Sequence, residues 1–351
     1  MKSRERVLAS IERRDFDRIP ADGWFRPEFW IKLHDHFNTE NNEDILKALG
    51  TDIRQVVMDP PKGFEPEKVL TVQNISKDFE NFYATVWDEW NIKRKAGSTD
   101  EYWHFTHHPL EHVELDEFEF PNIHAQGRFD RASDLVKEFK NEYFISGNGS
   151  IGLFEHGWAL RGYRNFIRDL YTNQKFIERL LDRLLEWKIE QDKYFADIGV
   201  DMIFLSDDLG MQTGLMLSPD IIRKFFIPRY RKWFGELKKK NVFVMFHTDG
   251  NVEPIIPDLI DAGIDILNPI QPECMDPIKI KKLYGEKIAF HGTISLQKTL
   301  PFGSTSEVKK EVMDRIETLG FDGGLILAPC HTVDQHVPVE NVITLYDTIR
   351  E

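Results

Sequence analysis

The sequence predicts an α/β fold, and within that class a (β/α)8 TIM barrel. Eight short apolar runs recur along the 351 residues, amphipathic stretches separate most of them, and polar residues gather where the runs end. A strand buried on both faces has a continuous apolar sequence, and alternation with helices is typical of parallel sheets. The expected strands are residues 19–25, 54–58, 143–147, 201–205, 242–247, 265–270, 288–292 and 325–329.

Helices are expected between these strands because apolar residues there recur with helical spacing. The clearest stretches are residues 130–142, 163–199, 218–240 and 304–320. Ser218 followed by Pro219 is a typical helix start, since serine caps the free N–H groups and proline fits the first turn.

Residues 64–120 do not fit the alternation and predict a hairpin-rich insertion between the second and third strands. The expected turn is AGSTD at residues 96–100. Such an insertion would form a lid, a homodimer surface or an exposed accessory hairpin, and the pattern does not separate these roles. With no internal repeat or low-complexity linker, residues 1–351 are expected to form one domain.

Composition restricts the class of partner. The chain is 41% hydrophobic and 30% charged, and no apolar run approaches the ~20 residues of a membrane span. The N-terminus has no signal-peptide pattern, so a cytoplasmic protein is expected. A net charge of −14 disfavours nucleic acid and anionic membranes. The two cysteines, Cys274 and Cys330, indicate no disulfide framework.

Residues just after the strands of a barrel face one another across a single cavity, whatever their separation in sequence. Here they include many imidazole, carboxylate and thiol groups. The set is Asp22, Trp24, Arg26, Glu155, His156, Trp158, Arg161, Asp207, Asp208, His247, Asp249, Asn268, Gln271, Glu273, His291, Cys330 and His331.

The run VFVMFHTDGN at residues 242–251 places His247 and Asp249 at a strand end. Two residues apart on an extended chain, their side chains point to the same side, and Cys330 would approach from the last strand. His247, Asp249 and Cys330 would form a zinc site with three protein ligands. Alternatively, the first two form hydrogen-bonded caps and Cys330 is a packed thiol, or Cys330 and His331 form a nucleophilic pair.

Other strand-end residues are candidates for proton transfer and substrate contact. Asp207 and Asp208 would supply a raised-pKa acid or a substrate anchor, or they would be an ordinary solvated or salt-bridged pair. Arg161 would bind substrate or pair with an acid, and His291 would act on substrate or be a satisfied core histidine. We assign catalysis to Asp207, Glu155 and His291. We assign substrate binding to Trp24, Arg26, Trp158, Arg161, Asp208, Asn268, Gln271 and His331.

Four segments together resemble the uroporphyrinogen decarboxylase superfamily in order and spacing. They are RERVLASIERRDFDRIP at 4–20, LSDDLGMQTGLMLSP at 205–219, HTDGNVEPIIPDLIDAGIDILNPIQP at 247–272 and YGEKIAFHGTIS at 284–295. The resemblance covers most of the chain apart from the insertion, and it implies a (β/α)8 barrel. That superfamily holds both decarboxylases and cobamide-dependent methyltransferases.

The residues favour the methyltransferase branch. The decarboxylases carry an arginine-rich motif after the first strand, whereas this chain has ADGWFRPEFW with Arg26 alone. The methyltransferases and cobalamin-independent methionine synthase carry a His-x-Cys pair and a late Cys on zinc. Here His247, Asp249 and Cys330 stand in similar places, and Gln271 stands where an acidic ligand is expected.

The resemblance therefore implies a zinc-dependent methyltransferase. It would move a methyl group between a small O-, N- or S-methyl compound or thiol and a corrinoid carried by a separate protein. The alternatives are a decarboxylase of the same superfamily and a non-catalytic protein that binds tetrapyrroles or corrinoids.

Overall fold

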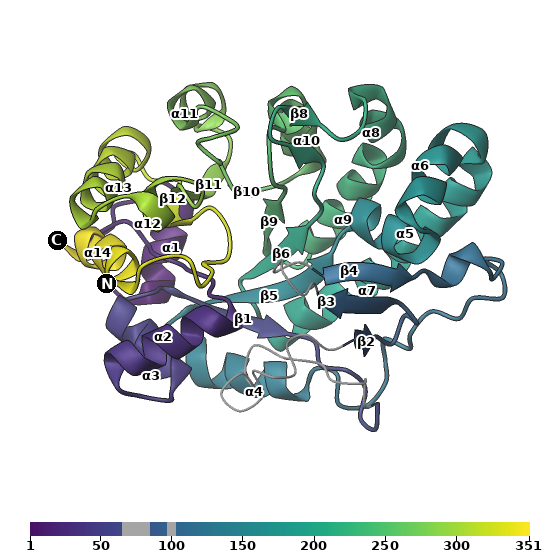
Figure 1. The fold of residues 1–351 in the computed structure, drawn as a ribbon, viewed down its shortest axis with the longest axis horizontal. Coiled ribbons are helices and arrows are strands. Elements are labelled where there is room, and N and C mark those ends of the chain that lie inside the picture. Colours follow the sequence, from purple (N-terminus) through teal and green to yellow (C-terminus); the bar gives the residue numbers. More distant parts are fainter. Residues whose placement is uncertain (65–84, 97–102) are drawn as a thin grey trace.

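A computed structural model describes residues 1–64, 85–96 and 103–351 of the chain. Its centre is a curled sheet of seven parallel strands with helices around it (Figure 1). In sheet order these are β1 (Ile53–Val57), β5 (Phe144–Ile151), β6 (Met202–Ser206), β9 (Phe243–His247), β10 (Ile266–Asn268), β11 (Ala289–Ile294) and β12 (Leu325–Pro329). The predicted α/β barrel architecture is confirmed.

The expected first strand, residues 19–25, is not a regular strand. It makes two isolated parallel bridges, Ala21 with Leu327 and Phe25 with Val333. Leu327 N donates to Pro20 O at 2.8 Å on one side, and Asp52 N donates to Ala21 O at 2.7 Å on the other. The segment thus lies between β12 and β1 and joins the two edges of the sheet. Pro20 has no N–H to donate, which shortens the ladder here.

Apolar side chains fill the end of the barrel where the strands begin, which we call the lower end. They come from all seven strands and from α1 (Ser3–Ile11), which therefore closes the end of the barrel where the strands begin. This inner cluster is Val7, Ile11, Ile53, Phe144, Met202, Phe204, Met245, Ile266, Ala289 and Ile326.

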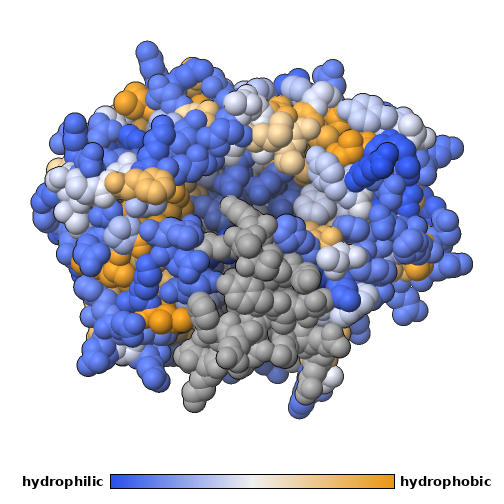
Figure 2. All heavy atoms as spheres, viewed as in Figure 1, coloured by the Kyte–Doolittle hydropathy of each residue, from blue (hydrophilic) through white to orange (hydrophobic). Residues whose placement is uncertain are grey.

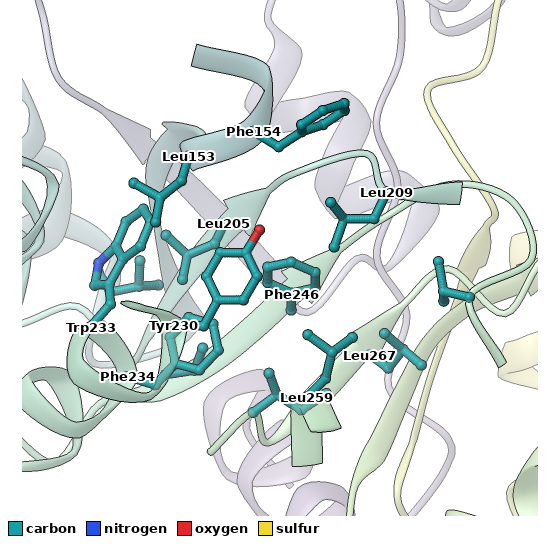
Figure 3. Close-up of a cluster of buried hydrophobic side chains, with 14 of the residues drawn as sticks. Leu153, Phe154, Leu205, Leu209, Tyr230, Trp233, Phe234, Phe246, Leu259 and Leu267 are labelled. Atoms are coloured by element: carbon teal, nitrogen blue, oxygen red, sulfur yellow. The ribbon is translucent and has the colours of Figure 1, made fainter. Parts of the chain in front are cut away.

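Helices cover the outside of the sheet. They are α2 (Pro27–Phe37), α3 (Asn42–Leu49), α4 (Asp130–Phe139), α5 (Leu153–Arg161), α6 (Tyr163–Thr172), α7 (Gln174–Ile198), α8 (Pro219–Phe225), α9 (Ile227–Lys238), α10 (Ile256–Ala262), α11 (Pro277–Tyr284), α12 (Thr299–Phe302), α13 (Thr305–Leu319) and α14 (Val339–Arg350). Figure 3 shows Tyr230, Trp233 and Phe234 of α9 beside Leu205 and Phe246 of the sheet. Each such buried side chain contributes roughly 1.5–3 kcal/mol.

Two of the predicted helices are each divided in the structure. Residues 163–199 form α6 and α7, which meet at Asn173, and residues 218–240 form α8 and α9. Pro228 lies in the first turn of α9, where its missing N–H removes no intrahelical hydrogen bond. The predicted cap is confirmed, because Ser218 Oγ accepts from Ile221 N at 3.4 Å.

The insertion lies between β1 and β5, as predicted, and contains an antiparallel sheet. Its strands are β2 (Thr85–Trp87), β3 (Lys93–Ala96) and β4 (Trp103–His107), in that order. The predicted turn at 96–100 lies outside the described residues beyond Ala96. The acidic segment 114–120 is not a strand. It buries Leu115 and Phe118, and Arg183 of α7 donates to the carbonyl oxygen atoms of both.

Among the described residues, no helix is both long enough and apolar enough to cross a membrane. That the whole chain forms one domain stays a prediction.

Candidate functional site at the barrel mouth

Three potential metal ligands meet where the strands end. His247 is the last residue of β9, Asp249 follows it, and His331 comes just after β12. His247 Nε2 lies 3.8 Å from Asp249 Oδ1, and His331 Nε2 lies 3.9 Å from Asp249 Oδ2. One ligand atom from each lies within 4.8 Å of the others. Ligands of one tetrahedral zinc lie roughly 3.3–3.5 Å apart, so small side-chain adjustments would suffice. We call these residues the donor cluster.

Cys330, the predicted third ligand, does not join this cluster. Its side chain is buried, and Sγ lies 3.8 Å from Ile270 O. Burial also holds the pKa of the Cys330 thiol well above its usual range, which disfavours the thiolate that a metal requires. Adjacent residues on an extended chain point to opposite sides. Because Cys330 packs into the protein against Ile270, His331 faces the cavity. The structure places His331, predicted as a substrate contact, where Cys330 was expected.

A buried chain of hydrogen bonds lies behind His247. Asn268 Oδ1 contacts His247 Nδ1, Asn268 Nδ2 lies 2.7 Å from His291 Nδ1, and His291 Nε2 lies 3.0 Å from Asp22 Oδ2. All four residues are at most 3% exposed. Strand register sets this alignment, because His247 and Asn268 are direct partners across β9 and β10. We call these four residues the relay.

The relay determines which nitrogen of His247 is open. The Asp22 carboxylate can only accept, so His291 carries its proton on Nε2 and accepts from the Asn268 amide on Nδ1. The Asn268 carbonyl oxygen then accepts from His247 Nδ1–H. His247 Nε2 is left with its lone pair directed toward Asp249, as in a metal-ligating histidine. The predicted catalytic residue His291 and the predicted substrate contact Asn268 both lie in this chain.

Trp24 forms the other wall beside the relay. Its ring stacks on His291 with centroids 5.2 Å apart and meets Phe204 edge-on at 5.0 Å. Trp24 also lines the cavity, in agreement with its predicted place at the mouth.

The loop after β9 is fixed by its neighbours. Asp249 N donates to Asp208 Oδ1 at 2.8 Å, and Gly250 N donates to Gln271 Oε1 at 3.2 Å. Gly250 has a φ of +83°, and a Cβ there would lie 2.6 Å from Met211 O, so only glycine fits. Met211 ends the short strand β7 (Gly210–Met211), which pairs with β8 (Gly214–Leu215). Asp208 and Gln271 therefore position the loop after β9 that carries Asp249.

Asp207 and Glu155, both predicted as catalytic, have different environments. Asp207 is fully buried and accepts from Tyr230 Oη at 2.5 Å and from Phe154 N and Glu155 N at 2.9 Å. It thus caps the first turn of α5, and burial raises its pKa to about 6. It is enclosed by protein.

Glu155 lies against the end of β6, beside Ser206 and Asp208, and is not among the described residues that line the cavity. Its Oε2 accepts from Asp208 N at 3.4 Å, and the side chain is partly buried. Burial, together with the charges of Asp208 and Asp207, raises the pKa of Glu155 to about 9. Glu155 therefore holds a proton at neutral pH.

Buried charges on α7 lie behind Glu155, and the sequence analysis missed them. Burial lowers the pKa of Lys188 to about 8 and raises that of Asp192 to about 8, and Lys188 interacts electrostatically with Asp207 and Glu155. Both residues are fully buried. The signal was their spacing, because Leu184, Lys188 and Asp192 follow one another at intervals of four along the apolar face of α7.

Three predicted substrate contacts have other surroundings. Arg161 pairs with Asp169 at 2.8 Å, and Trp158 meets Phe105 of β4 edge-on at 4.7 Å. Neither is among the described residues that line the cavity. Arg26 directly precedes α2, and its side chain makes no capping hydrogen bond there. The pKa of His331 is lowered mainly by burial and by His247, and Arg26 makes a smaller contribution in the same direction.

A cavity of about 590 Å³ opens at this end of the barrel, lined by Trp24, Phe204, Ser206, His247 and His331 among others. Figure 2 shows this side of the molecule hollowed near its centre, with hydrophilic residues inside the hollow. Volume and polar floor are those of a small-molecule site.

Residues 109–351 match the family model described as uroporphyrinogen decarboxylase (URO-D). The chain belongs to the URO-D family. The membership predicted from the sequence is therefore confirmed. Among curated proteins there is no match.

Two solved structures have a similar fold. A methyltransferase from Methanosarcina mazei is 19% identical with a TM-score of 0.75, over 100% of this chain and 98% of that one. A B12-independent methionine synthase from Shewanella sp. W3-18-1, in complex with selenomethionine, is 12% identical with a TM-score of 0.51, over 95% and 91%. At these identities the likeness establishes the fold.

Proposed function

We propose that this URO-D family member is a metal-dependent methyltransferase. It moves a methyl group between a small O-, N- or S-methyl compound or thiol and a corrinoid bound to a separate protein. The observation that carries the proposal is the donor cluster at the mouth, where the relay leaves His247 Nε2 open beside Asp249. The fold of the Methanosarcina mazei methyltransferase supports it.

The metal we propose is zinc, held by His247 Nε2, Asp249 and His331 Nε2. Two imidazoles and one carboxylate with an open fourth position are a common set in catalytic zinc sites. This assignment replaces Cys330 with His331, because only His331 has its ligand atom in the cluster. When bound, the metal supplies Lewis acidity to the heteroatom that carries the methyl group.

The chain's own residues have distinct roles in this scheme. The relay orients His247, and Asp208 holds the loop that carries Asp249. In the demethylating direction, the bond between methyl carbon and heteroatom breaks, the methyl group passes to the corrinoid, and the heteroatom takes the proton held by Glu155. In the opposite direction the proton of the thiol passes to Glu155 in its ionised form.

Decarboxylation of a polycarboxylate is disfavoured by the cavity's charge. Among the described residues that line it, Arg54 is the only lysine or arginine, and its Nε donates to Glu43 at 2.7 Å. Buried carboxylates without cationic partners cost several kcal/mol each. The cavity therefore suits a substrate of low charge.

Metal analysis of purified variants tests the proposal. We expect one equivalent of zinc in the wild-type protein and in Cys330→Ala, and its loss in Asp249→Ala and His331→Ala. Zinc lost from Cys330→Ala but retained in His331→Ala would refute the ligand assignment.

Methyl transfer is then followed by the absorbance change of cob(I)alamin with methylated compounds. Metal-free wild-type protein that transfers methyl groups at the same rate would refute the role of the metal. Zinc-loaded protein that methylates no corrinoid with any O-, N- or S-methyl donor would refute the reaction.

A further inference from the structure

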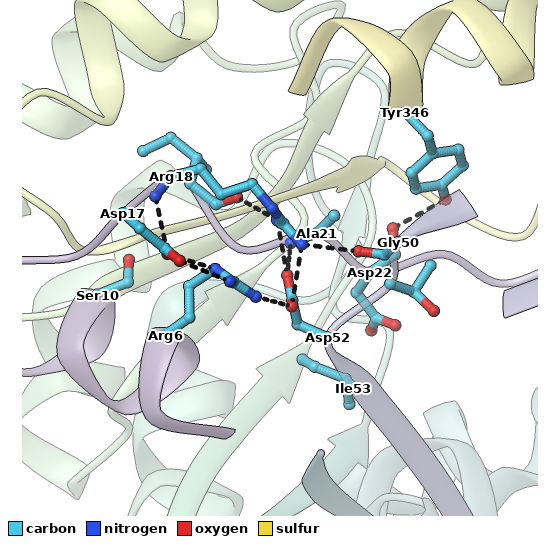
Figure 4. Close-up of polar contacts among 12 residues, drawn as sticks. Arg6, Ser10, Asp17, Arg18, Ala21, Asp22, Gly50, Asp52, Ile53 and Tyr346 are labelled. Atoms are coloured by element: carbon cyan, nitrogen blue, oxygen red, sulfur yellow. Dashed lines mark hydrogen bonds and ion pairs between the residues drawn. The ribbon is translucent and has the colours of Figure 1, made fainter. Parts of the chain in front are cut away.

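The interface between residues 19–25 and β1, which we call the seam, is closed only at its lower end. There Asp52 N donates to Ala21 O, and Ala21 N donates to Asp52 Oδ2 at 2.8 Å. Figure 4 shows this end, with Asp52 beside Ala21 and two arginines. Above it, among the described residues, no bridge joins residues 22–25 to β1.

The cavity extends through the upper part of the seam. Its inner wall carries His247 and His331, and its outer wall carries Leu46 of α3 and Leu135 and Phe139 of α4. The same cavity is therefore lined by two residues of the donor cluster, His247 and His331, and by side chains of two outer helices, α3 and α4.

Gln55 shows independently that the seam is hollow. It lies two residues after Ile53, which faces the barrel core, so its side chain points inward as well. Its neighbours Arg54 and Val56 are buried, yet Gln55 is exposed in the middle of a strand. An inward residue is exposed only where the layer around it is unfilled.

The lining indicates the chemistry of the occupant. The outer part is formed by Leu46, Leu135, Phe139 and the ring of Trp30, and Asn41, Asn42 and Glu43 also line the cavity. The guanidinium of Arg54 is already satisfied by Glu43 and by Thr51 O at 3.0 Å. The cavity of about 590 Å³ falls within the ~300–1,000 Å³ range of drug-sized ligand sites.

Very small methyl donors would use little of this surface. The best small ligands gain at most about 1.5 kcal/mol per non-hydrogen atom, so methanol would gain at most about 3 kcal/mol. A ring ether that fills the seam buries far more apolar area.

Resting on the function proposed above, we propose that the methylated compound or thiol has an uncharged, largely apolar body the size of an aromatic ring system. The body passes through the seam to Leu46, Leu135 and Phe139, while the heteroatom lies at the donor cluster. Gln55 is its polar contact and a determinant of specificity.

Calorimetric titration of the full-length protein tests this, with methoxynaphthalene, methoxybenzene and methanol as ligands. We expect affinity to fall in that order. Leu135→Trp and Leu46→Trp fill the outer part from opposite walls and should weaken methoxynaphthalene binding about tenfold or more. Leu283→Trp, at an exposed position on α11, is the matched control and should leave binding unchanged.

Gln55→Leu tests the polar contact with methoxyphenol and methoxybenzene. We expect the wild-type protein to prefer the phenol by a factor of roughly 2–10, the value of one hydrogen bond, and the variant to lose this preference. An unchanged preference would refute the role of Gln55.

Metal-free protein and Asp249→Ala separate this inference from the proposed function. Ring ethers that bind in the seam of metal-free protein or of Asp249→Ala would support the inference. If the wild-type protein as purified binds no zinc and still binds ring ethers there, the inference stands and the proposed function is refuted. The opposite result is zinc bound at the donor cluster in a protein that binds methoxynaphthalene no tighter than methanol, or whose affinity for methoxynaphthalene is unchanged in Leu135→Trp. It would refute the inference and leave the proposed function standing.

Discussion

The two ends of the barrel use the same residue types in opposite ways. At the lower end, the fully buried Asp52 accepts from Arg6 at 2.6 Å, from Arg18 at 2.9 Å and from the N–H of Ala21 (Figure 4). At the mouth, Asp208 and Asp249 each lie 3.8 Å from His247 Nε2, and both side chains are more than a third exposed.

This difference separates stability from function. At the lower end, the chain supplies its own cations, so the carboxylate is neutralised when the protein folds. At the mouth, the carboxylates meet imidazole and other carboxylates, an arrangement that attracts a cation from solution. The lower end therefore stabilises the fold, and the charges at the mouth are arranged to attract a cation.

The largest expected effect is at Asp52. Asp52→Ala leaves Arg18 without its carboxylate partner and Arg6 with Asp17 alone, and it removes the side chain that accepts from Ala21 N. We expect the free energy of unfolding to fall by about 3–5 kcal/mol, measured by urea denaturation.

The matched change at the mouth is Asp208→Asn. It should leave the metal-free protein as stable as the wild type or more so, because it removes repulsion among carboxylates. A loss at Asp208 as large as that at Asp52 would contradict the comparison.

The second effect concerns the relay. Asn268→Leu removes the groups that orient His247 and set its tautomer, so we expect zinc affinity to fall by about 10–100-fold. Competition with a chromophoric chelator measures the affinity without reference to activity. Val56→Ala, at a buried apolar position on β1, is a control and should lower stability without changing zinc affinity.

The fold could be predicted because continuous apolar runs determine buried parallel strands whatever their neighbours are. Seven of the eight runs became strands. The remaining run, residues 19–25, contains Pro20 and Gly23, which weaken strand pairing. Whether a hollow seam results depends on the distance between segments that are far apart in sequence. A pattern of single-residue preferences does not contain that distance.

The donor cluster could be predicted only in part. His247 and Asp249 follow a strong strand signal, so their shared direction was readable. The choice between Cys330 and His331 depends on a difference of one residue in where β12 ends, because side chains alternate. Lys188 and Asp192 were missed because charged residues on a long helix are normally on its exposed face.

The third effect is a pH dependence at Glu155. Its pKa is raised to about 9, so the folded chain holds a proton that the unfolded chain releases near its ordinary value of 4.5. Its contribution to stability is thus fully present below about pH 4.5 and is lost as pH rises toward 9. Glutamine at position 155 has no acidic proton to lose, so the Glu155→Gln variant lacks this pH dependence.

We therefore expect Glu155→Gln to gain stability over the wild type between pH 5 and pH 9, by on the order of 1 kcal/mol. Urea midpoints at three pH values measure this in metal-free protein. A constant difference would show that Glu155 is ionised in the fold, and the mouth would then hold one more free negative charge.

The smallest effect is expected at Asp17, which tests whether pairing or burial matters at the lower end. Asp17 also pairs with Arg6, at 2.6 Å, and Arg6 holds the pKa of the Asp17 carboxyl well below its usual range. The Asp17 side chain is 40% exposed, however, so water screens the pair.

Asp17→Asn should therefore cost about 0.5–1 kcal/mol, and less in high salt. Because the folded pKa is lowered, this contribution is present above about pH 3.8, the ordinary value, and is lost as pH falls through the folded pKa. Urea denaturation at low and high salt measures it. A cost equal to that of Asp52→Ala would mean that pairing with Arg6 stabilises the fold equally whether or not the carboxylate is buried. A much smaller cost would show that Asp52 stabilises the fold because its charge is neutralised away from water.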